Sequence, residues 1–452
     1  KIHDQKNNTL QKKLSLAKKT DLKYHQFITQ REKELTENIN LKKEAELLKN
    51  FGKITVLTAI EEDNFKNFIF SLESIKNQIF ENWEWIVGLN VKSERMLNLV
   101  KNATQKDSRI KILLLKSDDR YNQLLKESTG EYLCLLNSGD SFSPDTLFEA
   151  AKKINEKGAD LVYSDEDRVS ADLHYALPFF KPDWSPDLHL SFNYINRFAL
   201  YKKTVLFENG GFEKNFDKFP DYDLSLKITE KTKNIFHIPQ VLYHRFSVDT
   251  LNYFEPNNDE LYFVEKKSLQ NAIKRRGIPG FLTEKSGPPY YLRYNLDKNK
   301  SVSIIIPTKD KVDLLKNCIR SILEKTDYQN YEIIIVDNNS KEPGTFFYYE
   351  QLKKFGSEKI VLLDYKQPFN FSAINNFAAK TAKGEFIVFL NNDTEVINEG
   401  WLTALIEQAQ RPEVGAVGCK LYYPDGSLQH AGVIDWSKHA FVKKSDIGSY
   451  FE

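Results

Sequence analysis

Short apolar segments alternate with longer segments of helical period along most of the chain. One apolar run covers residues 54–60 and is followed by a helical pattern and by a second run at residues 82–87. The same succession begins again at Ile304 and reaches its second run at residues 330–336. Short buried strands that alternate with helices are typical of a mostly parallel sheet covered on both faces. The pattern therefore predicts an α/β fold.

The two alternating regions are copies of one unit. Asn122 precedes the apolar run that opens at Gly130, and Asn376 stands at the same distance before Gly384. The copies lie roughly 250 residues apart, whereas solenoid repeats have periods of about 20–50 residues. We therefore expect a duplicated domain, in which each copy has its own sheet.

The repeat divides the chain into four parts. A helical segment covers residues 1–50, a first domain covers 51–246, a linker with one helix covers 247–300, and a second domain covers 301–452. The N-terminal segment is rich in Lys, contains no Gly or Pro, and has a narrow apolar stripe. This stripe fits either a helical arm packed on the first domain or a helix that docks on a membrane surface or a partner.

Composition and charge narrow the function. The 64 Lys and Arg residues nearly balance the 63 Asp and Glu residues, so the formal net charge of +1 provides no field for nucleic acid. No run of about 18 apolar residues is present, so no membrane-spanning helix is expected. No signal peptide is visible, and the three cysteines have no metal or redox spacing. We expect a cytoplasmic protein, with peripheral attachment at the inner face of the cytoplasmic membrane as an alternative.

Polar side chains follow three of the expected strands. They stand at residues 137–140 and 391–393, after equivalent runs of the two copies, and at residues 337–340. Ligands of parallel sheets bind beyond the carboxyl ends of the strands, and clustered oxygen atoms suit a hard divalent cation and a ribose or base. Such a cation can bridge the two phosphates of a nucleotide sugar. The alternative is that Asn, Asp and Gly are ordinary turn residues at these places.

Several longer motifs occur in the same frame. They are Tyr163-Ser-Asp-Glu-Asp167, Phe180-Lys-Pro-Asp-Trp184-Ser-Pro-Asp187, Asp221-Tyr-Asp223-Leu, His237-Ile-Pro, Leu242-Tyr-His244-Arg and Gln429-His-Ala-Gly432. Together they resemble family-2 glycosyltransferases with the GT-A fold, especially tandem enzymes that build bacterial O-antigen and capsule chains. The resemblance covers about residue 54 to the end. It implies two tandem GT-A domains, Rossmann-like and mostly parallel, behind the N-terminal helical segment.

The resemblance also implies a reaction. A family-2 enzyme transfers a sugar from a nucleotide-diphosphate sugar to a glycan acceptor, and it inverts the configuration at the anomeric carbon. The expected donor is a UDP- or dTDP-sugar, and the expected cofactor is Mn²⁺ or Mg²⁺. The expected acceptor is a glycan or a lipid-linked glycan, and other polysaccharide-assembly enzymes are candidate partners.

The resemblance implies roles for particular residues. The base that removes the proton from the acceptor hydroxyl is expected at Asp221, with an exposed helix cap as the alternative role. Trp184 is a candidate acceptor platform, with a core tryptophan as the alternative. The expected donor-binding residues are Gly210, Gly211, Pro307, Thr308, Asp337 and Asn376. The expected metal positions are Asn137, Asp140, His244, Asn391 and Asp393.

The first copy departs from the family pattern in its donor half. Ala59 stands in place of the usual Pro, Leu89 and Asn90 replace aspartates after the next strand, and Gly139 interrupts the metal motif. Glycine supplies no side-chain ligand to a cation. The acceptor half of this copy, which contains Asp221, matches the pattern.

The second copy shows the opposite departure. It keeps the donor and metal residues, but the spacing from Asp140 to Asp221, counted from Asp393, passes the last residue of the sequence. We therefore expect the second domain to be incomplete at its C-terminal end. Three hypotheses remain. The second copy is active in a longer enzyme, or the first is active through an unusual metal site with Asp140 and His244, or the fold is inactive and binds a glycan or scaffolds a partner.

Overall fold

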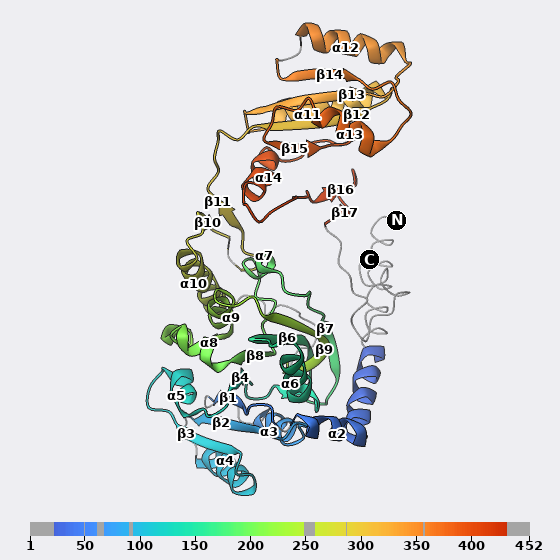
Figure 1. Ribbon diagram of the computed structural model, residues 1–452. Helices are drawn as coiled ribbons and strands as arrows, with labels where there is room; N and C mark the ends of the chain where they lie inside the picture. The colour runs from blue at the N-terminus through green and yellow to red at the C-terminus, as the bar shows by residue number, and fades with distance from the viewer. Residues whose placement is uncertain are drawn as a thin grey trace, which may run out of the picture. The chain divides into compact units, whose positions relative to one another are not determined.

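The computed structural model describes residues 22–48, 50–60, 67–89, 94–247, 258–285, 287–355 and 358–431. Asn90 and Gly432 lie outside the described residues. The described chain forms two compact units (Figure 1). The first unit contains the described residues up to Ile278 together with Leu282–Leu292, and the second contains the rest up to residue 431.

A helical arm opens the first unit. Residues 22–37 are helical, and α2 (Ile39–Leu47) follows after Asn38, whose side chain accepts hydrogen bonds from the first turn of α2. Tyr24 and Ile28 of the arm are buried against Val241. Part of the apolar stripe is therefore used for packing on the first unit, whereas Ile39 and Leu47 are exposed.

The first unit is built on a nine-stranded sheet with the order β3-β2-β1-β4-β8-β6-β9-β5, and β7 pairs with β6. The strands from β3 to β4 are parallel to one another, whereas β8 is antiparallel to both β4 and β6. The strands are β1 (Ile54–Ile60), β2 (Trp83–Leu89), β3 (Ile110–Leu114), β4 (Tyr132–Leu135), β5 (Ser141–Phe142), β6 (Leu161–Val169), β7 (Tyr175–Phe179), β8 (Ala199–Lys202) and β9 (Ile235–Phe246).

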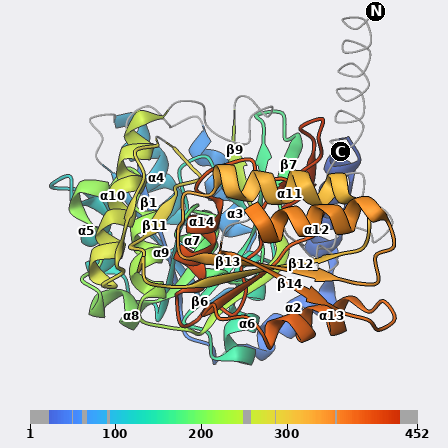
Figure 2. The same cartoon turned by 90° about the horizontal axis from the view of Figure 1, so that it is seen from above.

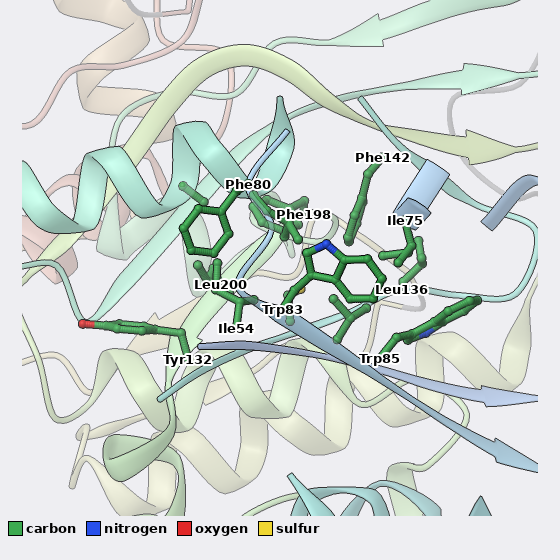
Figure 3. Packing of buried hydrophobic residues seen from close by; sticks show 14 of the residues in the cluster. Ile54, Ile75, Phe80, Trp83, Trp85, Tyr132, Leu136, Phe142, Phe198 and Leu200 are labelled. Atoms are coloured by element: carbon green, nitrogen blue, oxygen red, sulfur yellow. The ribbon is translucent and has the colours of Figure 1, made fainter. Parts of the chain in front are cut away.

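Helices cover this sheet and complete two apolar clusters. Alternate residues of β1 point to opposite faces, so Val56 joins the cluster around Trp83 and Trp85 (Figure 3), whereas Leu57 joins the cluster around Tyr163. The helices are α3 (Phe68–Lys76), α4 (Glu94–Lys106), α5 (Arg120–Glu127), α6 (Thr146–Lys157), α7 (Pro186–His189), α8 (Lys203–Glu208), α9 (Asp221–Thr229) and α10 (Asp259–Arg275).

The helix expected in the linker is α10, and it packs on α9. Leu269 and Ala272 of α10 form an apolar cluster with Tyr222 and Leu226 of α9. Two short strands follow, β10 (Gly280–Leu282) and β11 (Leu292–Tyr294), which pair with each other. None of the described helices is both long and apolar enough to cross a membrane.

The second unit is built on a four-stranded parallel sheet with the order β14-β13-β12-β15. One face carries α11, α12 and α14 and the other carries α13, and Figure 2 shows α11 and α12 on the side opposite α13. The main elements are β12 (Val302–Thr308), α11 (Val312–Lys325), β13 (Tyr331–Asp337), α12 (Pro343–Phe355), β14 (Ile360–Asp364), α13 (Phe371–Ala379), β15 (Phe386–Phe389) and α14 (Trp401–Ala409); β16 (Leu421–Tyr422) and β17 (Leu428–His430) form a separate pair.

The order of the four parallel strands is the same in both units. The strand that opens each repeat, β1 or β12, lies between the second and the fourth strand of its own copy. The registers agree as well, since Ile54 pairs with Trp83 in the first copy and Val302 pairs with Tyr331 in the second. The prediction of two tandem α/β domains from an internal repeat is confirmed.

A buried polar network is repeated in the two sheets. In the first copy, Thr55 Oγ1 donates to Glu84 Oε1 (2.7 Å) and accepts from the N–H of Gly130 (2.9 Å). In the second, Ser303 Oγ donates to Glu332 (2.6 Å) and accepts from Gly384 (2.8 Å). A Cβ at either glycine would collide with the first strand of its sheet. The glycines that mark the repeat in the sequence are therefore needed for this close approach.

Candidate active site

A cleft of ≈ 260 Å³ lies in the first unit. Its wall contains two residues singled out from the sequence, Asn137 after β4 and Asp221 at the start of α9. Arg197, from the loop before β8, and Arg245 of β9 line it as well. The cleft therefore brings the candidate base together with the first position of the candidate metal motif.

Asp221 is the first residue of α9 and is 7% exposed. Pro220 occupies the N-cap position before it, so Asp221 is not an exposed helix cap. Its carboxylate forms an ion pair with Nη1 of Arg197, which is itself buried. An ion pair between two buried side chains holds the carboxylate in one position. A base that must meet a substrate hydroxyl needs such positioning.

Glu166 of β6 joins the charged groups around the cleft. Its Oε2 lies 2.9 Å from Nζ of the fully buried Lys181 and accepts a hydrogen bond from the N–H of Arg197 (3.0 Å). Nη1 of Arg245 lies 3.6 Å from Glu166 Oε1. Although burial opposes ionisation, these cations keep the pKa of Glu166 below its usual value. The loop that carries Arg197 is therefore tied to the centre of the sheet.

Asp140 is not among the residues that line the cleft. Its carboxylate accepts hydrogen bonds from the Tyr243 hydroxyl (2.7 Å) and from the N–H of Phe246 (2.8 Å). Burial raises the pKa of this carboxyl, because burial disfavours the charged form. In this arrangement Asp140 ties the loop after β4 to the end of β9.

His244 of β9 lies between two carboxylates. Its Nδ1 is 2.6 Å from Asp167 Oδ1, and its Nε2 is 2.9 Å from Oε1 of Glu32 in the helical arm. Although burial opposes the charged form, the two carboxylates raise the pKa of His244 to about 10. An imidazolium carries a proton on both nitrogens and has no lone pair for a metal ion.

The other predicted residues of the first copy lie away from the cleft wall. Gly210 and Gly211 form the turn after α8 with positive φ angles of 81° and 73°. Asn122 holds this turn through two hydrogen bonds with the backbone of Phe212 (2.9 and 3.0 Å). Trp184 is half-buried at the edge of the cluster around Tyr163. The donor role of the two glycines and the acceptor role of Trp184 stay predictions.

Each copy has an equivalent backbone hydrogen bond just before its candidate metal motif, and these two bonds allow the motifs to be aligned. The N–H groups of Leu136 and Leu390 both donate to the first strand of their own sheet at 3.0 Å. Counting onward from these residues, Gly139 of the first copy occupies the position of Asp393 in the second. The first copy therefore lacks a side-chain ligand where the second copy has a carboxylate.

In the second unit, polar residues gather at the strand ends. Thr308 pairs in register with Asp337, and Asn392 Nδ2 donates to Thr308 Oγ1 (3.0 Å). Asp337 accepts hydrogen bonds from the Tyr349 hydroxyl (2.8 Å) and from the N–H of Ser340 (3.1 Å). The ends of β12, β13 and β15 are thus linked at one edge of the sheet.

The remaining predicted residues of the second unit lie close to this edge or on α13. Asn391 and Asp393 are exposed after β15, Pro307 is half-buried in β12, and Asn376 is exposed on α13. Within the described part of the chain, Asp393 makes no side-chain hydrogen bond. Its carboxylate oxygens are therefore open to a ligand.

The residues present fit a divalent cation differently in the two copies. Across the described residues, no group of three or more His, Cys, Asp or Glu side chains is arranged to hold a metal ion. In the first copy, Asp140 and His244 face protein partners and Gly139 has no side chain, so the donor set does not fit. In the second copy, Asn391 and Asp393 offer an amide oxygen and a carboxylate, and a bound diphosphate can supply further oxygens.

Several residues of the cleft were not found from the sequence. Arg197 was not singled out, Glu166 was noted only as part of the motif from Tyr163 to Asp167, and Tyr262 and Glu265 come from a helix assigned to the linker. One signal was available: β6 carries four consecutive charged residues and is buried along its whole length. Charged side chains in a buried strand require partners, and these partners form the site.

Comparison with known proteins agrees with this duplicated fold. The model of the family described as "Glycosyl transferase family 2" matches residues 56–207 and 303–446. The O-antigen biosynthesis protein RfbC of Myxococcus xanthus is 36% identical over 388 residues, which cover 84% of this chain and 30% of that protein. The uncharacterized protein y4gI of Sinorhizobium fredii is 32% identical over 406 residues, which cover 86% of this chain and 44% of that protein.

Among solved structures, S. aureus TarS 1-349 in complex with UDP-GlcNAc is 18% identical, with a TM-score of 0.40, and the match covers 49% of this chain and 66% of that chain. A parallel sheet with helices on both faces binds its ligands beyond the carboxyl ends of the strands. The family matches extend over both copies, and the chain belongs to glycosyl transferase family 2. It spans less than half the length of the two curated relatives.

Proposed function

We propose that this chain transfers a sugar from a nucleotide-diphosphate sugar to a glycan acceptor in the biosynthesis of a bacterial surface polysaccharide. Family membership and the similarity to an O-antigen biosynthesis protein support this function. The observation that carries it is the position of Asp221, buried at the cleft and paired with Arg197. A general base requires a carboxylate that is held in position at the cleft.

In the proposed reaction, Asp221 accepts the proton of the acceptor hydroxyl while the hydroxyl oxygen attacks the anomeric carbon. The bond from this carbon to the diphosphate breaks on the opposite side, so the configuration inverts. The carboxylate must come within about 2.6–3.2 Å of the hydroxyl once both substrates are bound. Arg197 acts as a positioning residue because it holds Asp221 in place.

We further propose that the second copy has a donor site of its own, separate from the site of Asp221, and that this site binds the nucleotide of a UDP- or dTDP-sugar. Thr308 and Asp337 would contact the base and ribose, and Asn391 and Asp393 would hold Mn²⁺ or Mg²⁺. When bound, this cation supplies Lewis-acid stabilisation to the leaving diphosphate. We place the reaction in the cytoplasm, with a glycan or a lipid-linked glycan as acceptor.

The experiment is the substitution Asp221→Asn in the full-length protein. Release of nucleoside diphosphate is measured with UDP- and dTDP-sugars and a glycan acceptor. We expect a loss of about 10²–10⁴-fold in turnover, the usual contribution of a general base. Asp259→Asn is the matched control, because Asp259 also begins a helix of the first unit but is exposed. Full turnover by Asp221→Asn would show that the first copy does not catalyse the transfer.

A further inference from the structure

Helix α10 and the segment after it form one wall of the cleft. Leu261, Tyr262 and Glu265 from the first half of α10 line it, and Pro288 lines it from the following segment. The second half of α10 packs on α9, the helix that carries Asp221. A helix that follows the first domain in the sequence therefore completes the candidate active site of that domain.

Glu265 has an incomplete set of hydrogen bonds. It is 8% exposed, and its Oε2 accepts a hydrogen bond from the Tyr290 hydroxyl (2.8 Å). Within the described part of the chain, no donor reaches Oε1, although the residue lines the cleft. Among the described residues, Oε1 is not one of the buried atoms that lack a partner, so this oxygen is open to the cleft. The carboxylate is therefore placed to accept a hydrogen bond from a ligand in the cleft.

Aromatic rings line the same cleft as this carboxylate. Tyr262, Phe219, Phe192 and Phe179 all line it and are half-buried. Flat apolar rings beside a hydrogen-bond acceptor suit a sugar, which has apolar C–H faces and hydroxyl donors. At this wall a phosphate group would meet the negative charge of Glu265, whereas Arg168, Arg197, Lys218 and Arg245 line other parts of the cleft. The wall therefore favours a neutral sugar over a diphosphate.

We propose that this wall is a subsite for the acceptor glycan, in which Glu265 Oε1 accepts a hydrogen bond from a sugar hydroxyl and the rings of Tyr262 and Phe219 pack on the sugar. The subsite rests on the proposed function for its role in transfer. Its glycan binding does not depend on turnover.

Binding is tested with the full-length protein on an array of neutral bacterial oligosaccharides, followed by titration of the strongest binder. Glu265→Gln and Tyr262→Ala are each expected to weaken binding about tenfold, while affinity for UDP or dTDP stays unchanged. Tyr262→Phe keeps the ring and should bind normally. Phe263→Ala is the surface control, since Phe263 lies on the same helix, is 68% exposed and is not among the lining residues.

Two results would overturn the subsite: no binding of any neutral oligosaccharide by the unaltered protein, or equal binding by Glu265→Gln, Tyr262→Ala and the control. Circular dichroism confirms that each variant is folded. If transfer itself is wrongly assigned, the unaltered protein binds the glycan without turnover. If only the subsite is wrong, turnover still depends on Asp221, but the acceptor KM does not respond to Glu265→Gln.

Discussion

The two copies share one scaffold and differ in the residues at its strand ends. The strand order and the buried network that contains Glu84 or Glu332 are the same in both sheets. At the metal motif, however, Gly139 of the first copy stands where the second copy has Asp393. The comparison shows that the interactions needed for the sheet are repeated, whereas the residues at the strand ends differ between the copies. Function must therefore be argued from each site and not from the shared fold.

In the first copy, Asp140 and His244, two residues expected to bind a metal, contact other parts of the protein. Asp140 holds the end of β9 through two hydrogen bonds, and His244 joins the helical arm to β6 through Glu32 and Asp167. Both oxygens of Asp140 accept hydrogen bonds, and His244 pairs with two carboxylates. In the second copy, the exposed Asp393 makes no such contact with another described residue. Polar residues that look alike in sequence thus make internal contacts in one copy and are exposed in the other.

The largest effect expected on stability concerns the glycine at the same place in each sheet. In Gly384→Ala, the new Cβ would lie 2.3 Å from the backbone nitrogen of Ser303, and in Gly130→Ala it would lie 2.7 Å from that of Thr55. Because a backbone cannot move aside easily, each substitution should lower the free energy of unfolding by about 3 kcal/mol or more. Thermal denaturation measures this loss. Gly415→Ala, with open space around it, should be neutral, and a mild effect at either sheet glycine would argue against the shared close approach.

The next largest effect is a pH dependence of stability that comes from Glu265 of the first unit. Burial raises the pKa of Glu265 to about 7 from its usual value of 4.5. The pKa of Glu265 is thus higher in the folded state than in the unfolded state. Its contribution to stability is complete below pH 4.5, the unfolded value, and is lost as the pH rises through about 7, the folded value. At pH 8–9 the cost is about 3 kcal/mol, so Glu265→Gln should stabilise the protein there and have little effect near pH 4.

Urea denaturation across this pH range measures the Glu265 effect. Glu385→Gln is the control, because Glu385 is exposed and pairs with Lys300 on the surface of the second unit. Its effect on stability should be small, because ion pairs on the surface contribute little. A stability difference between Glu265→Gln and the unaltered protein that is constant with pH would contradict the raised pKa.

A smaller effect tests whether the repeated network has the same energy in both copies. Thr55→Val and Ser303→Ala each remove a buried hydroxyl that donates to a Glu and accepts from a Gly. We expect each to lower the free energy of unfolding by about 1–3 kcal/mol, because a hydrogen bond to a charged group is lost and a buried N–H is left without a partner. Chemical denaturation of the two variants gives the comparison. A loss in only one copy would show that the two networks are not equivalent.

Much of the fold could be predicted from the sequence, because strands and helices are encoded locally. The alternation of apolar runs and the Gly130 and Gly384 positions were enough to expect two parallel sheets. The partners of polar side chains could not be predicted in this way. His244 meets Glu32 of the N-terminal arm, and the cleft is completed by Glu265 of α10. Such contacts join distant parts of the chain and leave no local pattern.

The measurement that tests the division between the copies most directly is titration of UDP and dTDP into the full-length protein with and without Mn²⁺. The account predicts that Asp393→Ala lowers the Mn²⁺-dependent affinity by at least about tenfold, and that Asp140→Asn, checked for folding, leaves it unchanged. The opposite result, a loss with Asp140→Asn and none with Asp393→Ala, would place the nucleotide and its cation in the first copy and contradict the account.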